Sequence, residues 1–235
     1  ARMHNVYSEA IIDIKGIPDL NIYEINDDEL IMGAAITLRK IAELNLFPLL
    51  SLTVQRIADH TIQDKITLGG NIAGTIIYRE AVLPLMVANS DIVIAGKDGT
   101  NRFAFKDIFN KKLKLNKGDL ICQIIIKRKY LNLPSIHVKR TKVDKIDYPL
   151  ITMVVLRKDE KTNFAFSGLG EYPFRSSKFE QIINSNKLDK DKKIKDAINS
   201  INTLISDDLH GRSEYKVFML HTIISEALEE LKGVN

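Results

Sequence analysis

The chain has no tryptophan and only one cysteine, and aromatic residues make up 7% of its 235 residues. With so few aromatic rings, the sequence offers no base-stacking platform for a nucleic acid. A single cysteine excludes a disulfide within this sequence, and it excludes an iron–sulfur cluster ligated by the cysteines of this chain alone. The cysteine, Cys122, lies in the apolar run Leu120–Ile126, where we expect a buried, unreactive thiol.

The sequence also lacks long apolar runs and the common catalytic motifs. No run approaches the about 20 apolar residues of a membrane-spanning helix, and no signal peptide opens the chain, so we expect a cytoplasmic protein without a membrane partner. The five histidines show no metal-ligand spacing such as HExxH, and GxSxG, GxGxxG and a complete P-loop are absent. We therefore expect no metal ligand and no catalytic residue, and any redox chemistry would come from a bound cofactor.

Charged residues are plentiful but mixed in sign. The chain has 34 basic and 30 acidic residues, and its densest cluster, Asp189–Lys193, combines both signs. A mixed cluster is typical of a solvated helix start, so we expect no nucleic-acid partner. Apolar residues make up 45% of the chain, which is enough for the core of one large domain or two small ones.

The order of the hydrophobic patterns predicts an α+β protein with two lobes. Residues 10–14 are typical of a buried strand, residues 19–35 of a β-hairpin, and Thr37 of the N-cap of a helix over residues 38–44. Further helical patterns cover residues 48–60 and 81–89 and the chain beyond residue 173, ending in a helix with Ser213 as its N-cap and Gly233 at its end. Strands are expected at 91–95, 101–105, 119–127, 136–140, 150–156 and 163–167, with a boundary between the lobes near residues 129–134.

The stretch Thr67–Gly74 has the most unusual composition, because it holds three glycines, a hydroxyl and a carboxamide in eight residues. Glycine can adopt positive φ and approach a ligand closely, and consecutive free N–H groups in such a loop can hold a phosphate. The same composition fits a tight loop between two packed elements. On the residues alone, both interpretations stay open.

Five segments, in this order and spacing, resemble the FAD-binding (medium) subunit of the molybdenum hydroxylases, the xanthine dehydrogenase and carbon monoxide dehydrogenase flavoprotein family. The segments are Ile11–Leu20, Asp27–Leu30, Met32–Leu38, Thr67–Ile72 and His210–Lys216. The resemblance implies a vanillyl-alcohol-oxidase (PCMH)-type FAD-binding domain over residues 1–130. It implies a C-terminal domain of antiparallel sheet and helical bundle over residues 131–235.

The resemblance also implies a function, that of an oxidoreductase subunit. The FAD would accept electrons from iron–sulfur clusters on a partner subunit and pass them to NAD or another acceptor. A further partner subunit would carry the molybdopterin at which a substrate is hydroxylated. The implied cofactor of this chain is FAD.

Seven residues match cofactor-binding positions of the family. Thr67 matches a hydroxyl that meets the FAD diphosphate, and Gly69, Gly70 and Asn71 match the loop that wraps the cofactor. The other three matches are Glu80, where the family has aspartate near the flavin or its ribityl chain, Lys139, a strand lysine near the flavin, and Ile121, an apolar position that packs on the cofactor. Their structural alternatives are a helix-start carboxylate, a solvated lysine and a core residue.

The sequence departs from the family in three places. Gln63-Asp64 stands where the family has Arg-Asn, and Ile76–Tyr78 replaces small residues, Pro and Ser. The family also has a strand–helix–strand unit ahead of Ala1 that ends in a second glycine-rich loop, and the sequence begins after that unit. These departures motivate an alternative function, a non-catalytic assembly module with a flavoprotein-like fold that binds no FAD.

Overall fold

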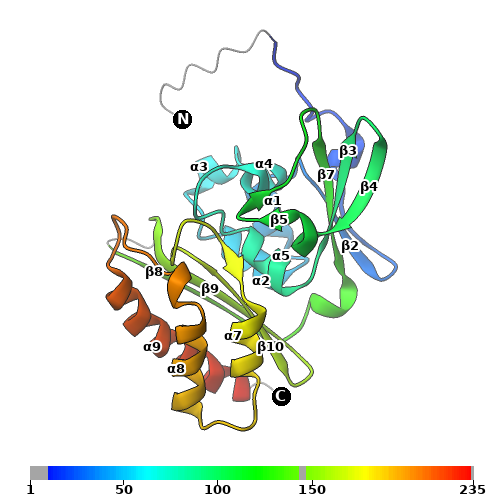
Figure 1. The fold of residues 1–235 in the computed structure, drawn as a ribbon. Helices are drawn as coiled ribbons and strands as arrows, with labels where there is room; N and C mark the ends of the chain where they lie inside the picture. The colour runs from blue at the N-terminus through cyan, green and yellow to red at the C-terminus, as the bar shows by residue number, and fades with distance from the viewer. Residues whose placement is uncertain (1–9, 143–146, 234–235) are drawn as a thin grey trace.

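The computed structural model of the chain describes residues 10–142 and 147–233 and shows two lobes (Figure 1). The first lobe is built on a five-stranded antiparallel sheet with the strand order β1-β2-β7-β3-β4. Its strands are β1 (Tyr23–Asn26), β2 (Glu29–Gly33), β3 (Asp91–Gly96), β4 (Gly99–Ala104) and β7 (Leu120–Lys127). The apolar strand β7 lies in the middle, where Ile124 pairs with Met32 on one side and Ile92 on the other.

Short helices accompany this sheet. They are η1 (Pro18–Asn21), α1 (Leu38–Leu44), α2 (Pro48–Val54), α3 (His60–Gln63), α4 (Leu68–Ala73), α5 (Val82–Val87), α6 (Phe105–Ile108) and η2 (Arg128–Tyr130). All of them except η1 and α3 contribute side chains to one core with the sheet. A small hairpin of β5 (Phe109–Asn110) and β6 (Lys112–Leu113) follows α6. Thr37 caps α1 because its hydroxyl accepts the Lys40 N–H at 3.2 Å.

The second lobe is a four-stranded antiparallel sheet, with the order β11-β10-β9-β8, backed by helices. Its elements are β8 (Ser135–Thr141), β9 (Pro149–Lys158), β10 (Lys161–Ser167), β11 (Phe174–Arg175), α7 (Ser177–Ile183), α8 (Lys190–Ser200), η3 (Asn202–Leu204) and α9 (Ser213–Lys232). Met153 and Val155 of β9 pack toward these helices, whereas Val154 and Leu156 join the core of the first lobe. Because β9 is covered on both faces, its sequence is apolar from Pro149 to Leu156 with the single exception of Thr152.

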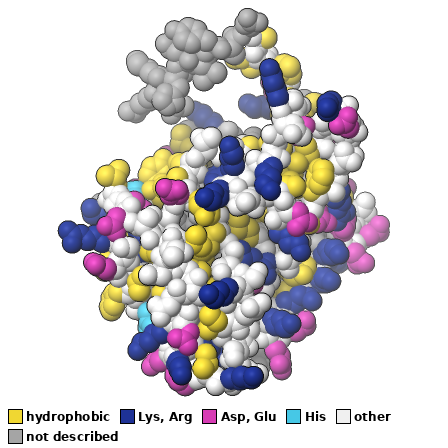
Figure 2. Space-filling view, in the orientation of Figure 1, with side chains coloured by type: hydrophobic (Ala, Val, Ile, Leu, Met, Phe, Trp, Pro, Cys, Tyr) yellow, Lys and Arg dark blue, Asp and Glu magenta, His cyan; other side chains and the backbone are white. Residues whose placement is uncertain are grey.

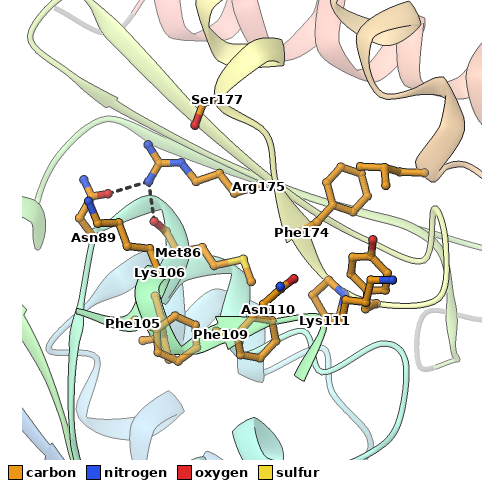
Figure 3. Close-up of a pocket in the computed structure, with 14 residues that line it drawn as sticks. Met86, Asn89, Phe105, Lys106, Phe109, Asn110, Lys111, Phe174, Arg175 and Ser177 are labelled. Carbon is orange, nitrogen blue, oxygen red and sulfur yellow. Dashed lines mark hydrogen bonds between the residues drawn. The ribbon is translucent and has the colours of Figure 1, made fainter. Parts of the chain in front are cut away.

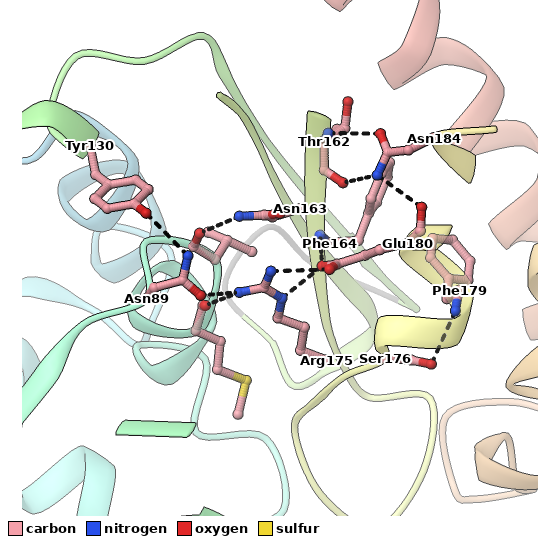
Figure 4. Close-up of polar contacts among 12 residues, drawn as sticks. Asn89, Tyr130, Thr162, Asn163, Phe164, Arg175, Ser176, Phe179, Glu180 and Asn184 are labelled. Atoms are coloured by element: carbon pink, nitrogen blue, oxygen red, sulfur yellow. Dashed lines mark hydrogen bonds and ion pairs between the residues drawn. The ribbon is translucent and has the colours of Figure 1, made fainter. Parts of the chain in front are cut away.

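Polar contacts also join the lobes (Figure 4). Arg175 of β11 donates to the Met86 carbonyl and to Asn89 Oδ1, both at 2.7 Å, and forms an ion pair with Glu180 at 2.7 Å. Asn163 of β10 donates to the Val87 carbonyl at 2.8 Å. The end of α5 is therefore fixed against the second sheet.

Most predicted elements are confirmed, including the hairpin over residues 19–35, all six strands from residue 91 to residue 167, and the long last helix. The predicted strand at residues 10–14 is wrong: Ile11 and Ile12 are 89% and 85% exposed, and no strand in the described part of the chain pairs with them. The helix predicted up to His60 ends at Val54, and Asp59 caps the separate helix α3. His4 lies outside the described residues.

Two further expectations differ in detail. Cys122 is half-buried rather than buried, and its thiol lies 3.6 Å from the Leu120 carbonyl oxygen. The N-cap of α9 is Arg212 rather than Ser213, whose N–H is donated to Asp207 Oδ1 at 2.7 Å. Among the described helices, none is long and apolar enough to cross a membrane.

A buried ion pair fixes the segment His210–Lys216 at the start of α9. Lys216 is fully buried, and its Nζ donates to Asp208 Oδ2 at 2.7 Å and to the Ser206 carbonyl at 2.9 Å. Asp208 Oδ1 accepts the backbone N–H groups of His210 and Gly211. Burial alone would raise the pKa of Asp208, but the bonds from Lys216 and the two N–H groups lower it overall.

Replacing Lys216 with methionine is expected to lower the free energy of unfolding by about 2–3 kcal/mol, because the substitution leaves Asp208 without its cation. In the unsubstituted protein the lowered pKa of Asp208 stabilises the fold above pH about 4, and this contribution is lost as the pH falls further. Urea unfolding at pH 7 measures the first effect and a pH series measures the second. The control is Lys232→Met, on the exposed end of the same helix, and an equal loss in both variants contradicts the assignment.

Candidate cofactor site

Helix α4 stands between two cavities. One cavity, of ≈ 600 Å³, is lined by Thr67, Gly69, Gly70 and Ile121 among others, and the second, of ≈ 350 Å³, by Asn71, Glu80 and Lys139 among others. The seven predicted cofactor-binding residues therefore line two separate cavities, four of them one cavity and three the other. Because Gly70 and Asn71 are consecutive, the two cavities are only the width of α4 apart.

The sequence leaves two interpretations of residues 67–74 open, a phosphate-holding loop and a tight loop between packed elements, and the structure shows a short helix instead of either loop. Leu68–Ala73 is helical, and Thr67 is its N-cap, because the hydroxyl accepts the Gly70 N–H at 3.1 Å. The N–H of Gly69 is donated to the Ala34 carbonyl at 2.9 Å. The free N–H cradle for a phosphate is therefore absent here, since these two groups already have acceptors within the chain.

Close packing explains the first glycine of the helix. A Cβ on Gly69 would lie 2.8 Å from the Ala34 Cβ and 3.0 Å from its carbonyl oxygen. A Cβ on Gly70 would meet only Thr67 Oγ1, at 3.0 Å, so the space beside it is open. Glycine at these two positions lets α4 lie against the strand end at Ala34 and keeps the larger cavity free.

Residues in or beside two strands of the first sheet, β2 and β7, form part of the wall of the larger cavity. Ala34 and Ala35, which follow β2, form one part of its wall, and Ile121 of β7 forms another. Ile121 is almost fully buried and pairs with Ile94, so it is a core residue whose surface also lines the cavity. Small and apolar side chains dominate this lining, which suits a ligand that is held by shape and by backbone contacts.

The smaller cavity contains a buried ion pair. Lys139 Nζ lies 2.8 Å from Glu80 Oε2, and the two side chains are 3% and 6% exposed. Lys139 also donates to the Arg56 carbonyl at 2.8 Å, and the Thr152 hydroxyl donates to Glu80 Oε1 at 2.6 Å. Burial raises the pKa of Glu80, and the Lys139 ammonium and the Thr152 hydroxyl offset part of that increase.

This geometry explains what glutamate does at position 80. Its carboxylate lies between a lysine on β8 and a threonine on β9, at directly opposed positions of the strand pair. The third ammonium hydrogen of Lys139 has no acceptor among the described residues. The pair is neutral overall, but its ammonium keeps one N–H donor in a fixed position that a group in the cavity can accept.

Aromatic rings close the other side of this cavity. Tyr78 stacks on Tyr148 with ring centroids 4.8 Å apart, and His210 meets Tyr78 edge-on at 5.8 Å. Tyr78 and Tyr148 line the cavity. His210 belongs to the segment His210–Lys216 of the family resemblance. This segment therefore contacts a residue of the cavity wall, Tyr78, although the two are far apart in the sequence.

Sequence reasoning missed Thr152, Tyr148 and the alanines at 34 and 35. Thr152 could have been identified as a site residue from its pairing with Lys139 across β8 and β9. That pairing is known only once the register of the two strands is known. Gln63, a departure from the family pattern, is buried and donates to the carbonyls of Gln55 and Ala58. It joins α2 to α3 rather than lining either cavity.

The residues present fit a polar cofactor that spans both cavities. The side-chain oxygen Asn71 Oδ1 is buried and has no hydrogen-bond partner among the described residues, although it lines the smaller cavity. A buried acceptor without a donor is costly, and a ligand N–H or O–H would satisfy it. In the part of the chain that the structure describes, no three His, Cys, Asp or Glu side chains gather as metal ligands.

Residues 1–127 match a family described as the FAD binding domain in molybdopterin dehydrogenase. No curated protein matches the chain. Several solved structures do match it over most of its length, and their sequence identities are low.

A carbon monoxide dehydrogenase from Hydrogenophaga pseudoflava that lacks the Mo-pyranopterin moiety of the molybdenum cofactor is 18% identical, with a TM-score of 0.77, over 91% of this chain and 78% of that chain. Quinoline 2-oxidoreductase from Pseudomonas putida 86 is 16% identical, with a TM-score of 0.78, over 94% and 81%. Reconstituted CO dehydrogenase from Oligotropha carboxidovorans is 18% identical, with a TM-score of 0.78, over 93% and 80%. At these identities the matches show a shared fold, the predicted α+β fold of the PCMH type.

Proposed function

Because the chain belongs to the family of FAD-binding domains of molybdopterin dehydrogenases, we propose that it holds FAD in the two cavities beside α4. One observation carries this proposal: all seven predicted cofactor residues line these cavities, and Asn71 Oδ1 lies there buried and without a donor. The family match does not favour the alternative of an assembly module without FAD.

Each predicted residue has a task that its surroundings allow. Thr67 keeps its hydroxyl hydrogen for a ligand, since among the described residues its Oγ1 only accepts, from Gly70. Gly69 and Gly70 give the cofactor room along α4, and Ile121 contributes an apolar wall. Thr67 would meet the diphosphate, in line with its position in the family.

The smaller cavity would take the flavin end of the cofactor. Asn71 Oδ1 would accept a hydrogen bond from it, and the ammonium of Lys139, held by Glu80, would stabilise negative charge on it. When bound, FAD supplies the exchange of electrons that no side chain of this protein provides. Thr152 keeps the Glu80 carboxylate turned toward Lys139 and so holds the positive charge in place.

We propose that the chain acts as the flavoprotein component of an oxidoreductase complex. Electrons would pass from iron–sulfur clusters on one partner subunit, through the FAD, to NAD or another acceptor, as in a xanthine dehydrogenase-like enzyme. A second partner subunit would carry molybdopterin. One matched structure supports this setting, since it is a CO dehydrogenase described by the Mo-pyranopterin moiety of the molybdenum cofactor that it lacks.

We propose further that the chain has two domains, 1–130 and 131–235. The two hydrophobic cores support this boundary, because the second core contains only residues from Ile136 onward. Three residues of the second sheet, Val154, Leu156 and Ala165, pack in the first core. The domains would therefore share an apolar interface rather than a flexible linker.

The test of the proposed site is FAD binding by an Asn71→Ala variant. We expect its dissociation constant for FAD to rise about tenfold, because one hydrogen bond to a buried acceptor is lost. Quenching of FAD fluorescence on titration measures the constant. The control is Asn199→Ala, on the exposed face of α8, and the site assignment fails if the two variants bind FAD equally well.

A further inference from the structure

A third cavity lies where the two lobes meet (Figure 3). Its volume is ≈ 540 Å³, and its lining comes from α5, α6 and β5 on one side and from β11, α7 and η3 on the other. None of its lining residues lines either cavity beside α4. The space is thus separate from the proposed FAD site.

The lining of this cavity is rich in cations and has no carboxylate. Lys106, Lys111 and Arg175 contribute to it, and Figure 2 shows Lys and Arg side chains around the middle of this face. The charge of Arg175 is balanced by Glu180, through contacts of 2.7 and 3.0 Å. Among the described residues, Lys106 and Lys111 have no carboxylate within ion-pair distance.

A third positive charge, without a carboxylate partner within residues 10–142 and 147–233, lies between this cavity and the smaller cavity beside α4, because Arg79 contacts the wall of the one and lines the other. Arg79 is 4% exposed, its Nη2 donates to the Lys111 carbonyl, and its guanidinium carbon lies 5.2 Å from the centroid of the Phe109 ring. Its Nε and Nη1 are buried and have no partner in the described part of the chain, and no carboxylate there pairs with it. A buried cation without an anion is costly, so Arg79 favours a negative ligand on either side, in the smaller cavity that it lines or in the third cavity whose wall it contacts.

Lys111 is held in an unusual conformation at the edge of the cavity. Its φ is +62°, in the left-handed region, at the turn between β5 and β6. The bond from Arg79 fixes its carbonyl, and its Nζ lies 5.1 Å from the centroid of the Tyr172 ring. Figure 3 shows Lys106 and Lys111 on different sides of the space, with Arg175 above them. Such a strained position persists only where its surroundings impose it.

We propose that this cavity binds a phosphate-bearing ligand of nucleotide size. Lysines are common phosphate ligands, and Lys106 and Lys111 supply two of them from one short segment. The volume falls within the usual range of small-molecule sites, and Tyr172 and Phe174 offer aromatic surface for a base. The lining from both lobes favours a small molecule over an acidic segment of a partner protein.

The test is calorimetric titration of the protein with ADP and, separately, with inorganic phosphate, in the presence of saturating FAD so that ADP does not take the cofactor site. We expect ADP to bind more tightly than inorganic phosphate, because only ADP reaches the aromatic surface. The double variant Lys106→Gln/Lys111→Gln should weaken ADP binding at least about tenfold, since two charged contacts are lost. The matched control is Lys112→Gln/Lys178→Gln, which removes two neighbouring exposed lysines outside the lining.

Three results would overturn the proposal. The first is no ADP binding by the unsubstituted protein, and the second is equal binding by the double variant and its control. The third is a double variant that keeps its ADP affinity but no longer associates with its partner subunits, which would assign the lysines to protein docking. An unchanged melting temperature in the double variant confirms that the fold is intact.

Discussion

Replacing Lys139 with methionine is expected to lower the free energy of unfolding by about 3–5 kcal/mol at pH 7, the usual cost of breaking a buried ion pair. Glu80 lies 2.8 Å from the Lys139 ammonium and is almost fully buried, so the substitution leaves a carboxylate without a cation in the interior. Urea unfolding measures the loss. The control is Lys195→Met, on an exposed position of α8.

The pH dependence of this variant has a definite sign. Burial already raises the pKa of Glu80 in the folded protein, and removing Lys139 raises it further. Between the unfolded pKa, about 4.3, and the higher folded pKa, the folded state binds more protons than the unfolded state. Stability of Lys139→Met should therefore rise as the pH falls from 7 toward 5.

Adding Glu80→Gln to Lys139→Met should recover most of the lost stability, because glutamine buries no charge and still accepts from Thr152. A loss below about 1 kcal/mol for the single variant, or stability that does not change with pH, would contradict a buried charge pair.

Replacing Gly70 with leucine should weaken FAD binding by about a hundredfold while changing the stability of the fold by much less, because the helix propensity of leucine offsets the 3.0 Å approach of its Cβ to the Thr67 hydroxyl. A leucine in this position would enter the open space beside α4, and overfilling a site costs about 1–3 kcal/mol. FAD titration and urea unfolding together measure these two effects.

The control for this prediction is Gly233→Leu at the end of α9, where an added Cβ meets only ordinary contacts. Unchanged FAD affinity in Gly70→Leu would show that the cofactor does not lie along this side of α4. A large loss of stability would instead show that the space beside Gly70 belongs to the packed core.

The sequence predicted the helices and strands better than it predicted which residues they pack against. The strands from residue 91 onward and the cap at Thr37 follow from local patterns, which is why they are confirmed. The run at residues 10–14 is apolar in the same way but finds no partner strand, so its pattern misleads. Burial depends on neighbours that local periodicity does not contain.

The candidate site shows the same limit. Thr67 and the glycines were found from composition, but their role as an N-capped helix with occupied N–H groups depends on Ala34, more than 30 residues earlier. Family positions identified Glu80 and Lys139, whereas their mutual ion pair depends on the tertiary structure that brings β8 beside the residues before α5. Thr152 and Tyr148 carried no local signal of this site.

The central claim is that FAD occupies the cavities on both sides of α4. A crystal structure of the protein with bound FAD tests it most directly. The account predicts the diphosphate beside Thr67 and Gly70, with the flavin close enough to Asn71 and Lys139 to hydrogen-bond with them. FAD bound elsewhere, with both cavities empty, would contradict it.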